Sequence, residues 1–254
     1  MIALNPKTPS VKIENLALHT YNGTASHSTA RELKVGIGLG DKLSIVYTGS
    51  FERYQGLDLL LKSAMIVRDH HPEVFLILVG GSPQQVEHWK NEARQLGLED
   101  CTRFTGIVPP EEAVVYLEIA QILVSPRING TSVPLKIYSY LYSGKAIVAT
   151  DLPAHTQVLN EKIAVLVEPT QEALADGILK LVQSPDLRRR LGRRAQQFAR
   201  ERFNAADYLA KVDQIYQELI PSTPPPEQAA PPPQPDQARS QKQAAVPPPL
   251  NPES

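Results

Sequence analysis

The segment from Ser125 to Thr150 combines cationic side chains with a glycine-bearing loop and the expected start of a helix. Its sequence is SPRINGTSVPLKIYSYLYSGKAIVAT. Free backbone N–H groups at a helix N-terminus, together with the positive end of the helix dipole, favour anions. Arg127 and Lys136 add fixed positive charge on either side of that opening. The segment therefore predicts an anion site, and phosphate is the expected ligand group.

The helix after this loop is expected to begin at residues that can cap it. Thr131 or Ser132 is predicted as the cap, and Pro134 suits the first turn because its missing N–H costs little there. One face of this helix is polar and carries Ser132, Lys136, Ser139 and Ser143. Either this face only meets solvent, or it turns Lys136 toward a phosphate, because the helix starts at the carboxyl end of a strand.

Small residues also follow the other predicted strands in the first half of the chain. In open α/β sheets, ligands bind beyond the carboxyl ends of the strands. Each glycine there is also an ordinary turn residue, but four loops that converge on one edge favour a binding site. The predicted lining residues outside the Ser125 to Ser132 loop, with its Gly130, are Gly49, Ser50, Gly80, Gly81, Ser82, Gly106, Ile107 and Val108.

The elements that must position these residues follow an alternating pattern. Apolar runs predict strands at residues 43–47, 74–79, 102–105, 121–124, 146–149 and 164–167, with helices between them and nearly continuous helix after residue 172. Near-continuous apolar strands that alternate with helices indicate a parallel sheet covered on both faces. With right-handed crossovers, the pattern predicts a doubly wound, Rossmann-like α/β domain over residues 41–220.

The two ends of the chain differ from this domain. Residues 1–40 are predicted to be the remnant of an interdomain connector, with a short helix at 29–36. Residues 221–254 are rich in Pro, Gln, Ala and Ser and lack apolar periodicity. They are predicted to be a disordered, Pro-rich tail, either a plain linker or a ligand for a P-x-x-P-binding domain.

Composition excludes several classes of protein. The net charge of −1 argues against a dedicated nucleic-acid binder, and a single cysteine excludes a disulfide framework or a cysteine-based zinc site. No apolar run approaches the ~20 residues of a membrane span, so a cytoplasmic location is expected. The basic cluster Arg188 to Arg194 is either a solvated helix face or a patch for a membrane surface or partner.

Other familiar chemistry is missing from the sequence. It contains no P-loop motif, no G-x-S-x-G elbow and no D-x-D pair, and its six histidines show no metal-ligand spacing. His70, His71 and His155 are predicted to be surface or helix-end residues rather than catalysts. We therefore expect neither a metal nor a cofactor.

Four ordered motifs resemble the C-terminal, donor-binding domain of family 4 glycosyltransferases, which have the GT-B fold. They are YTGSF…GLDLLL from Tyr47, FLILVGG from Phe75, RFTGIVPPEE from Arg103 and, above all, the segment from Ser125 to His155. The resemblance covers about residues 43–219. It implies a metal-independent, retaining transferase that takes a sugar from a nucleoside-diphosphate donor. It also implies a second, N-terminal domain, with the acceptor site in the cleft between the two domains and a catalytic residue from the N-terminal one.

The resemblance also implies roles for individual residues. The donor base is expected near Gly106, Ile107 and Val108, and the diphosphate near Gly49, the Gly130 to Ser132 loop and Lys136. The family pattern departs at four places, where two basic residues and two glutamates are replaced by Ser50, Gln55, Thr131 and Ser139. The negative charge of the diphosphate would then be balanced by Arg53, Arg127 and Lys136, with Arg127 and Lys136 as the catalytic cations.

Two other functions stay open. One is a non-catalytic nucleotide- or protein-binding module that kept the fold after losing its chemistry. The other is a nucleotide-sugar epimerase, which shares the GT-B architecture, although the missing acidic catalytic set argues against it. Because no N-terminal domain is recognisable in the sequence, activity is expected to need a further domain or a partner polypeptide, and contact with a membrane surface is an open alternative.

Overall fold

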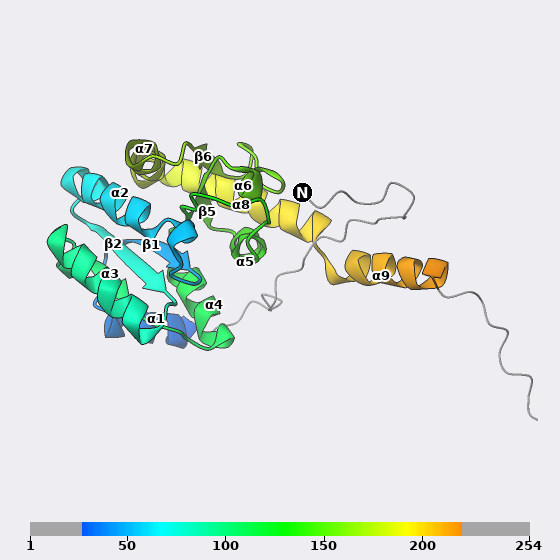
Figure 1. The fold of residues 1–254 in the computed structure, drawn as a ribbon, viewed down its shortest axis with the longest axis horizontal. Helices are drawn as coiled ribbons and strands as arrows, with labels where there is room; N and C mark the ends of the chain where they lie inside the picture. The colour runs from blue at the N-terminus through cyan, green and yellow to red at the C-terminus, as the bar shows by residue number, and fades with distance from the viewer. Residues whose placement is uncertain (1–26, 220–254) are drawn as a thin grey trace, which may run out of the picture.

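The computed structural model describes residues 27–219 and places them around one parallel sheet (Figure 1). The strand order is β3-β2-β1-β4-β5-β6, and every neighbouring pair is parallel. This is the predicted doubly wound, Rossmann-like α/β fold. The strands are β1 (Leu43–Thr48), β2 (Val74–Val79), β3 (Thr102–Phe104), β4 (Ile122–Ser125), β5 (Ala146–Thr150) and β6 (Val165–Val167).

Helices fill the crossovers between the strands, precede the first strand and follow the last. They are α1 (His27–Gly36), α2 (Leu57–His70), α3 (Pro83–Gln95), α4 (Pro110–Ile119), α5 (Lys136–Ser143), α6 (Pro153–Thr156), α7 (Gln171–Gln183), α8 (Pro185–Arg202) and α9 (Ala205–Leu219), with short 3-10 turns η1 (Arg53–Gln55) and η2 (Glu99–Cys101). The stretch predicted as nearly continuous helix after residue 172 is divided into α7, α8 and α9 by short breaks before Pro185 and at Asn204. In Figure 1, α9 runs outward from the body of the domain.

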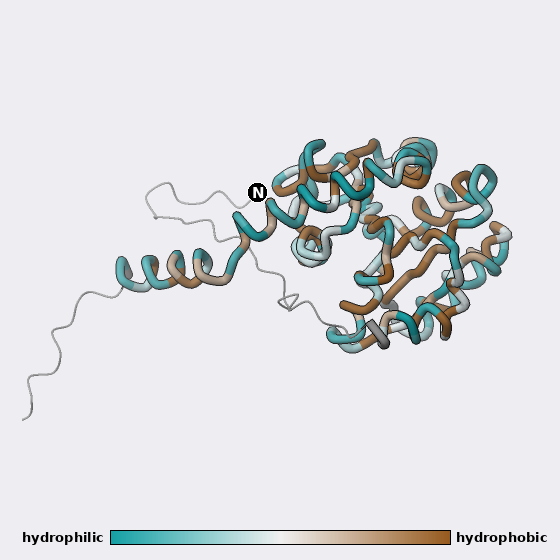
Figure 2. The backbone as a smooth tube through the Cα atoms, turned by 180° about the vertical axis from the view of Figure 1, so that it is seen from behind, coloured by the Kyte–Doolittle hydropathy of each residue, from teal (hydrophilic) through white to brown (hydrophobic). Residues whose placement is uncertain are grey.

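Alternate strand residues feed two apolar cores, one on each face of the sheet. Ile45 and Leu76 point into the core beneath α2 and α7, whereas Val46 and Ile77 point into the core beneath α4 and α5. Strands buried on both faces need apolar residues at every position, which is why β2 reads VFLILV without alternation. Figure 2 shows the same arrangement, with hydrophobic strands inside and hydrophilic helix surfaces outside.

The segment predicted as a connector contributes to the second core where it is described. Helix α1 is followed by Ile37 and Leu39, which are both buried in that core, and Arg103 donates a hydrogen bond to the carbonyl of Ile37 at 3.3 Å. Residues 27–40 therefore pack onto the domain. The rest of the predicted connector and the predicted tail lie outside the described residues. None of the helices in the described part is long and apolar enough to cross a membrane.

The sheet leaves the loops after β1, β2, β3 and β4 at one edge. Because all neighbouring strands are parallel, their carboxyl ends lie at the same edge of the sheet. Gly80 and Gly106 are joined by an isolated bridge, in which Gly80 N donates to Gly106 O at 2.9 Å. This bridge brings the loops after β2 and β3 together, next to the loop after β1.

Candidate functional site

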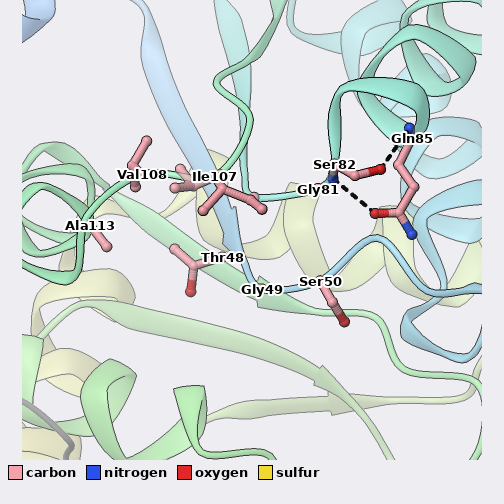
Figure 3. A pocket seen from close by; sticks show the side chains of 11 residues that line it. Thr48, Gly49, Ser50, Gly81, Ser82, Gln85, Ile107, Val108 and Ala113 are labelled. Atoms are coloured by element: carbon pink, nitrogen blue, oxygen red, sulfur yellow. Dashed lines mark hydrogen bonds between the residues drawn. The ribbon is translucent and has the colours of Figure 1, made fainter.

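A hollow of ≈ 500 Å³ lies at this edge of the sheet (Figure 3). Its lining residues come from the ends of β1 and β2, from the loops after β1, β2 and β3, and from α3 and α4. None of them carries a charge: Thr48, Gly49, Ser50, Val79, Gly80, Gly81, Ser82, Gln85, Ile107, Val108 and Ala113. Ile107 is 79% exposed at the rim, so it presents apolar surface to the hollow's mouth. The hollow therefore suits an uncharged, partly apolar group.

Glycine is required where the loops after β1 and β2 meet. Gly80 has a φ of 127°, and a Cβ there would overlap the carbonyl oxygen of Gly49. At the opposite wall, Ser82 begins α3 with a capping box: it accepts from Gln85 N at 3.3 Å, and Ser82 N donates to Gln85 Oε1 at 3.0 Å. This cap fixes the start of α3 beside the hollow.

Lys136 lies directly beside this hollow, held by neutral groups. Its Nζ donates to Gln55 Oε1 at 3.1 Å and lies 3.9 Å from the centre of the Tyr47 ring. A Cβ at Gly49 would come within 2.8 Å of Nζ, so the glycine makes room for the ammonium group. Burial, and secondarily the nearby Arg127, hold the pKa of Lys136 well below its usual range.

Arg127 supplies the second cation. Its Nη1 donates to the carbonyl of Ser132 at 2.7 Å, and its guanidinium lies over the Tyr54 ring, 4.9 Å from the centroid. Its Nε is buried without a hydrogen-bond partner. Within residues 27–219, neither Arg127 nor Lys136 has a carboxylate within ion-pair distance. Two neighbouring cations without acidic partners form an anion-binding arrangement, because a bound anion offsets both their repulsion and the cost of burying charge.

The start of α5 differs from the sequence prediction. The helix begins at Lys136 rather than after a cap at Thr131 or Ser132, and its N-cap residue, Leu135, makes no side-chain cap. Ser132 uses its carbonyl to accept from Arg127, and Pro134 precedes the helix instead of lying in its first turn. The prediction failed because the path of this segment also depends on a contact far along the chain: Gln157, 26 residues after Thr131, donates to the carbonyl oxygen of Thr131.

His155 was predicted as a surface or helix-end residue, and the surface assignment is wrong. Its side chain is completely buried, with Nε2 2.8 Å from Ser125 Oγ and Nδ1 2.8 Å from the carbonyl oxygen of Thr150. Burial lowers the pKa of His155 to about 4, with a further contribution from the positive charges of Lys136 and Arg127. His70 is exposed and His71 half-buried, as predicted.

The other predicted site residues divide into two groups. Gly49, Ser50, Gly80, Ile107 and Val108 line the hollow. Thr131 and Ser132 are exposed in the loop before α5, and Ser139 is half-buried in the second turn of that helix. Gly130 has a φ of 115° and lies against the Arg127 guanidinium.

Arg53 lies apart from the other two cations. It lines a different hollow together with Phe51, Asp58, Gln84, Gln85, His88 and Trp89. The structure therefore leaves Arg53 at the second hollow, whereas Lys136 lies beside Gly49 of the first hollow with Arg127 near it.

Sequence reasoning missed the neutral groups that hold the site. Tyr47, Gln55 and Tyr140 are all buried, and the Tyr140 hydroxyl accepts from Thr48 N at 2.8 Å, which ties α5 to the end of β1. Burial raises the pKa of Tyr140 to about 12. Gln55 and Lys136 are 81 residues apart, so no local spacing could reveal their contact. No group of three or more His, Cys, Asp or Glu side chains that could hold a metal occurs in the part of the chain that the structure describes.

Residues 31–198 match the family model described as glycosyl transferases group 1. A D-inositol 3-phosphate glycosyltransferase of Corynebacterium jeikeium is 30% identical over 208 residues, which are 78% of this chain and 48% of that protein. An uncharacterized glycosyltransferase of Methanocaldococcus jannaschii is 23% identical over 195 residues, 76% of this chain and 50% of the relative. The chain thus spans about half the length of the curated relatives it matches.

Solved structures share the fold. An Anabaena protein, HepE, in complex with UDP superposes with a TM-score of 0.69 at 17% identity, over 76% of this chain and 53% of HepE. A glycosyltransferase from Rickettsia africae gives a TM-score of 0.73 at 19% identity, over 84% of this chain and 58% of that protein.

Proposed function

Because the chain belongs to the group 1 glycosyltransferases, we propose that its Rossmann-like domain binds a nucleoside-diphosphate sugar and is the donor-binding half of a sugar-transferring enzyme. The uncharged hollow takes the nucleoside, and the neighbouring cations take the diphosphate. The UDP bound by the Anabaena structural neighbour supports this class of ligand.

One observation carries the proposal: Arg127 and Lys136 lie close together with only neutral partners in the described part of the chain. Lys136 is held by an amide oxygen and an aromatic ring, and Arg127 by a carbonyl oxygen and an aromatic ring. Such partners carry no negative charge that would compete with an anionic ligand. A diphosphate can contact both side chains and would favour the charged form of Lys136, whose pKa burial holds low.

The proposed mechanism follows from where charge develops. When the sugar leaves the donor, negative charge grows on the diphosphate, and fixed cations that oppose it lower the barrier. Arg127 and Lys136 fill this role, aided by the N-terminal end of α5, which begins at Lys136. We propose that the reaction retains the configuration of the sugar and that it requires neither a metal nor a cofactor besides the donor and the acceptor.

A further polypeptide segment completes the proposed enzyme. The chain spans about half the length of its curated relatives, which supports an acceptor site and catalytic group on another domain or partner polypeptide. A cytoplasmic location stays a prediction from the sequence.

Thermal unfolding against UDP, GDP, ADP and their sugars tests the proposal. A ligand present at about 100 times its dissociation constant should stabilise the domain by about 2.7 kcal/mol. The corresponding nucleosides, which lack the diphosphate, should stabilise it far less. If no nucleotide shifts the transition, the proposal fails and the non-catalytic remnant of the fold becomes the better description.

A further inference from the structure

A closed network of buried hydrogen bonds lies beneath Arg127. Ser125 ends β4, Thr150 ends β5, and His155 sits in the short helix α6; all three are 0% exposed. Because a carbonyl oxygen can only accept, the 2.8 Å contact with Thr150 O places a proton on His155 Nδ1. The uncharged ring then accepts at Nε2 from the Ser125 hydroxyl at 2.8 Å.

The network ends on the backbone of Arg127. Thr150 Oγ1 donates to the carbonyl oxygen of Arg127 at 2.5 Å and lies 3.2 Å from His155 Nδ1. Ser125 precedes Arg127 by two residues, so His155 holds this stretch of chain at two points. From Ser125 to Ile128 the backbone is anchored further by the hydrogen bond from Ile128 N to Tyr54 O at 3.0 Å.

We propose that His155 is a positioning residue, which fixes the backbone of the Arg127 loop and thereby the direction in which Arg127 presents its guanidinium to a bound diphosphate. The inference rests on the proposed function, since it needs an anion at Arg127. His155 itself is completely buried and touches no ligand. It acts only through Ser125, Thr150 and the backbone of Arg127.

The neutral state of the ring suits this role. A protonated ring could not accept at Nε2, so the Ser125 hydrogen bond requires the uncharged form. The low pKa of His155 keeps that form dominant at neutral pH, and burial is its main cause. The same ring would be a poor general acid or base, because buried positions exclude the reacting groups.

A double-mutant cycle separates positioning from mere structural support. The variants are H155A, R127A and the double variant, and the probe is UDP, with affinity measured by calorimetry at a temperature where all variants are folded. H155A should weaken UDP binding about tenfold, the effect of one ordinary hydrogen bond. In the R127A background, H155A should change the affinity by less than about twofold, since the guanidinium that His155 positions is already absent.

Two further variants supply rescue and control. In H155N the amide nitrogen takes the place of Nδ1 and keeps the bond to Thr150 O, so H155N should recover most of the affinity that H155A loses. Ser63 offers a matched control: it is equally buried, but it bonds Leu59 O and Gln171 O between α2 and α7. S63A should lower the unfolding temperature and leave the UDP affinity unchanged.

Equal losses of UDP affinity from H155A in both backgrounds would overturn the inference, as would an equal loss of affinity in S63A.

Amide exchange of Ile128 provides a readout without ligand, since this amide is hydrogen-bonded to Tyr54 O in the anchored loop. H155A should accelerate its exchange more than S63A does. If the wild-type domain does not bind UDP, the proposed function fails for this nucleotide, while unchanged exchange at Ile128 would sink the positioning role separately.

Discussion

Two loops at the same edge of the sheet face the proposed diphosphate site with different charge. The first loop, residues 49–56, follows β1, and the second loop, residues 126–135, follows β4; the two strands are neighbours. Around the site the first loop offers Gly49, Ser50 and the buried amide of Gln55. The second loop brings Arg127 and leads directly into Lys136, so both cations at the site come from its side.

The difference teaches that the position of a charge is set by the fold rather than by one loop. In the family pattern the first loop carries basic residues where this chain has Ser50 and Gln55. Gln55 stands where the family pattern has a lysine. Here the Lys136 ammonium donates to Gln55 Oε1, so a positive charge lies at the end of the Gln55 side chain. Adjacent strands bring both loops to one place, and either loop can therefore supply the charge.

The largest expected effect comes from forcing the two loops apart. Gly56 has a φ of 74°, and a Cβ there would overlap the carbonyl oxygen of Pro126 in the second loop. G56A should therefore destabilise the fold by about 3 kcal/mol, measured by chemical denaturation. G36A is the matched control, because nothing lies within 4 Å of a Cβ at Gly36; its effect should stay within about 0.5 kcal/mol. Equal stabilities would show that the loops do not depend on their contact.

Removing the charge that directly follows the second loop, at Lys136, should have the next largest effect. K136M keeps the aliphatic stem beside Tyr47 but loses the ammonium, so UDP affinity should fall about 10- to 100-fold, as expected for a charge-assisted hydrogen bond. R53A removes a cation of the first loop that lines the other hollow, and calorimetry should show little change. A larger loss for R53A than for K136M would reverse the assignment of charge to the second loop.

Moving the charge back to the first loop should restore part of the binding. The double variant Q55K/K136Q exchanges the two partners of the 3.1 Å hydrogen bond. Its ammonium starts from the first loop, as in the family pattern, and should end near the same point. We expect UDP binding about tenfold tighter than in K136Q alone, the value of one ordinary hydrogen bond. No recovery would mean that the direction of approach matters as well as the charge.

The smallest effect is on the pH dependence of binding. The pKa of Lys136 is well below its usual range because of burial and Arg127. A bound diphosphate would raise this pKa. Binding is therefore accompanied by proton uptake at any pH where Lys136 of the free protein is partly deprotonated. UDP affinity should then decline as pH rises, by no more than about tenfold per pH unit. Calorimetry in buffers of different ionisation enthalpy measures the number of protons taken up on UDP binding. K136M should abolish the part of this uptake that comes from Lys136.

Without ligand the same pKa shift has the opposite sign for stability. The unfolded chain holds the Lys136 proton more tightly than the folded domain does, so raising the pH between the two pKa values stabilises the fold. Chemical denaturation as a function of pH, with K136M as the reference, separates this contribution from that of other groups.

The fold and the location of the site follow closely from sequence patterns. The apolar run at Val74 to Val79 coincides with β2 to the residue, because a strand buried on both faces leaves a continuous signal. Glycines after the first four strands marked the edge where the hollow lies. The start of α5, the burial of His155 and the separation of Arg53 from the other cations escaped prediction, because each depends on contacts between residues far apart in the chain.

The amino-acid sequence by itself determined that this chain forms a doubly wound sheet and that cationic residues gather at its carboxyl edge, since strand periodicity, glycines and charge are local properties. Only the tertiary structure decided which cations act together and what holds them. Lys136 meets Gln55 across 81 residues, and Ser125 meets His155 across 30. Such contacts arise when neighbouring strands bring their loops together, and no spacing within a single loop encodes them.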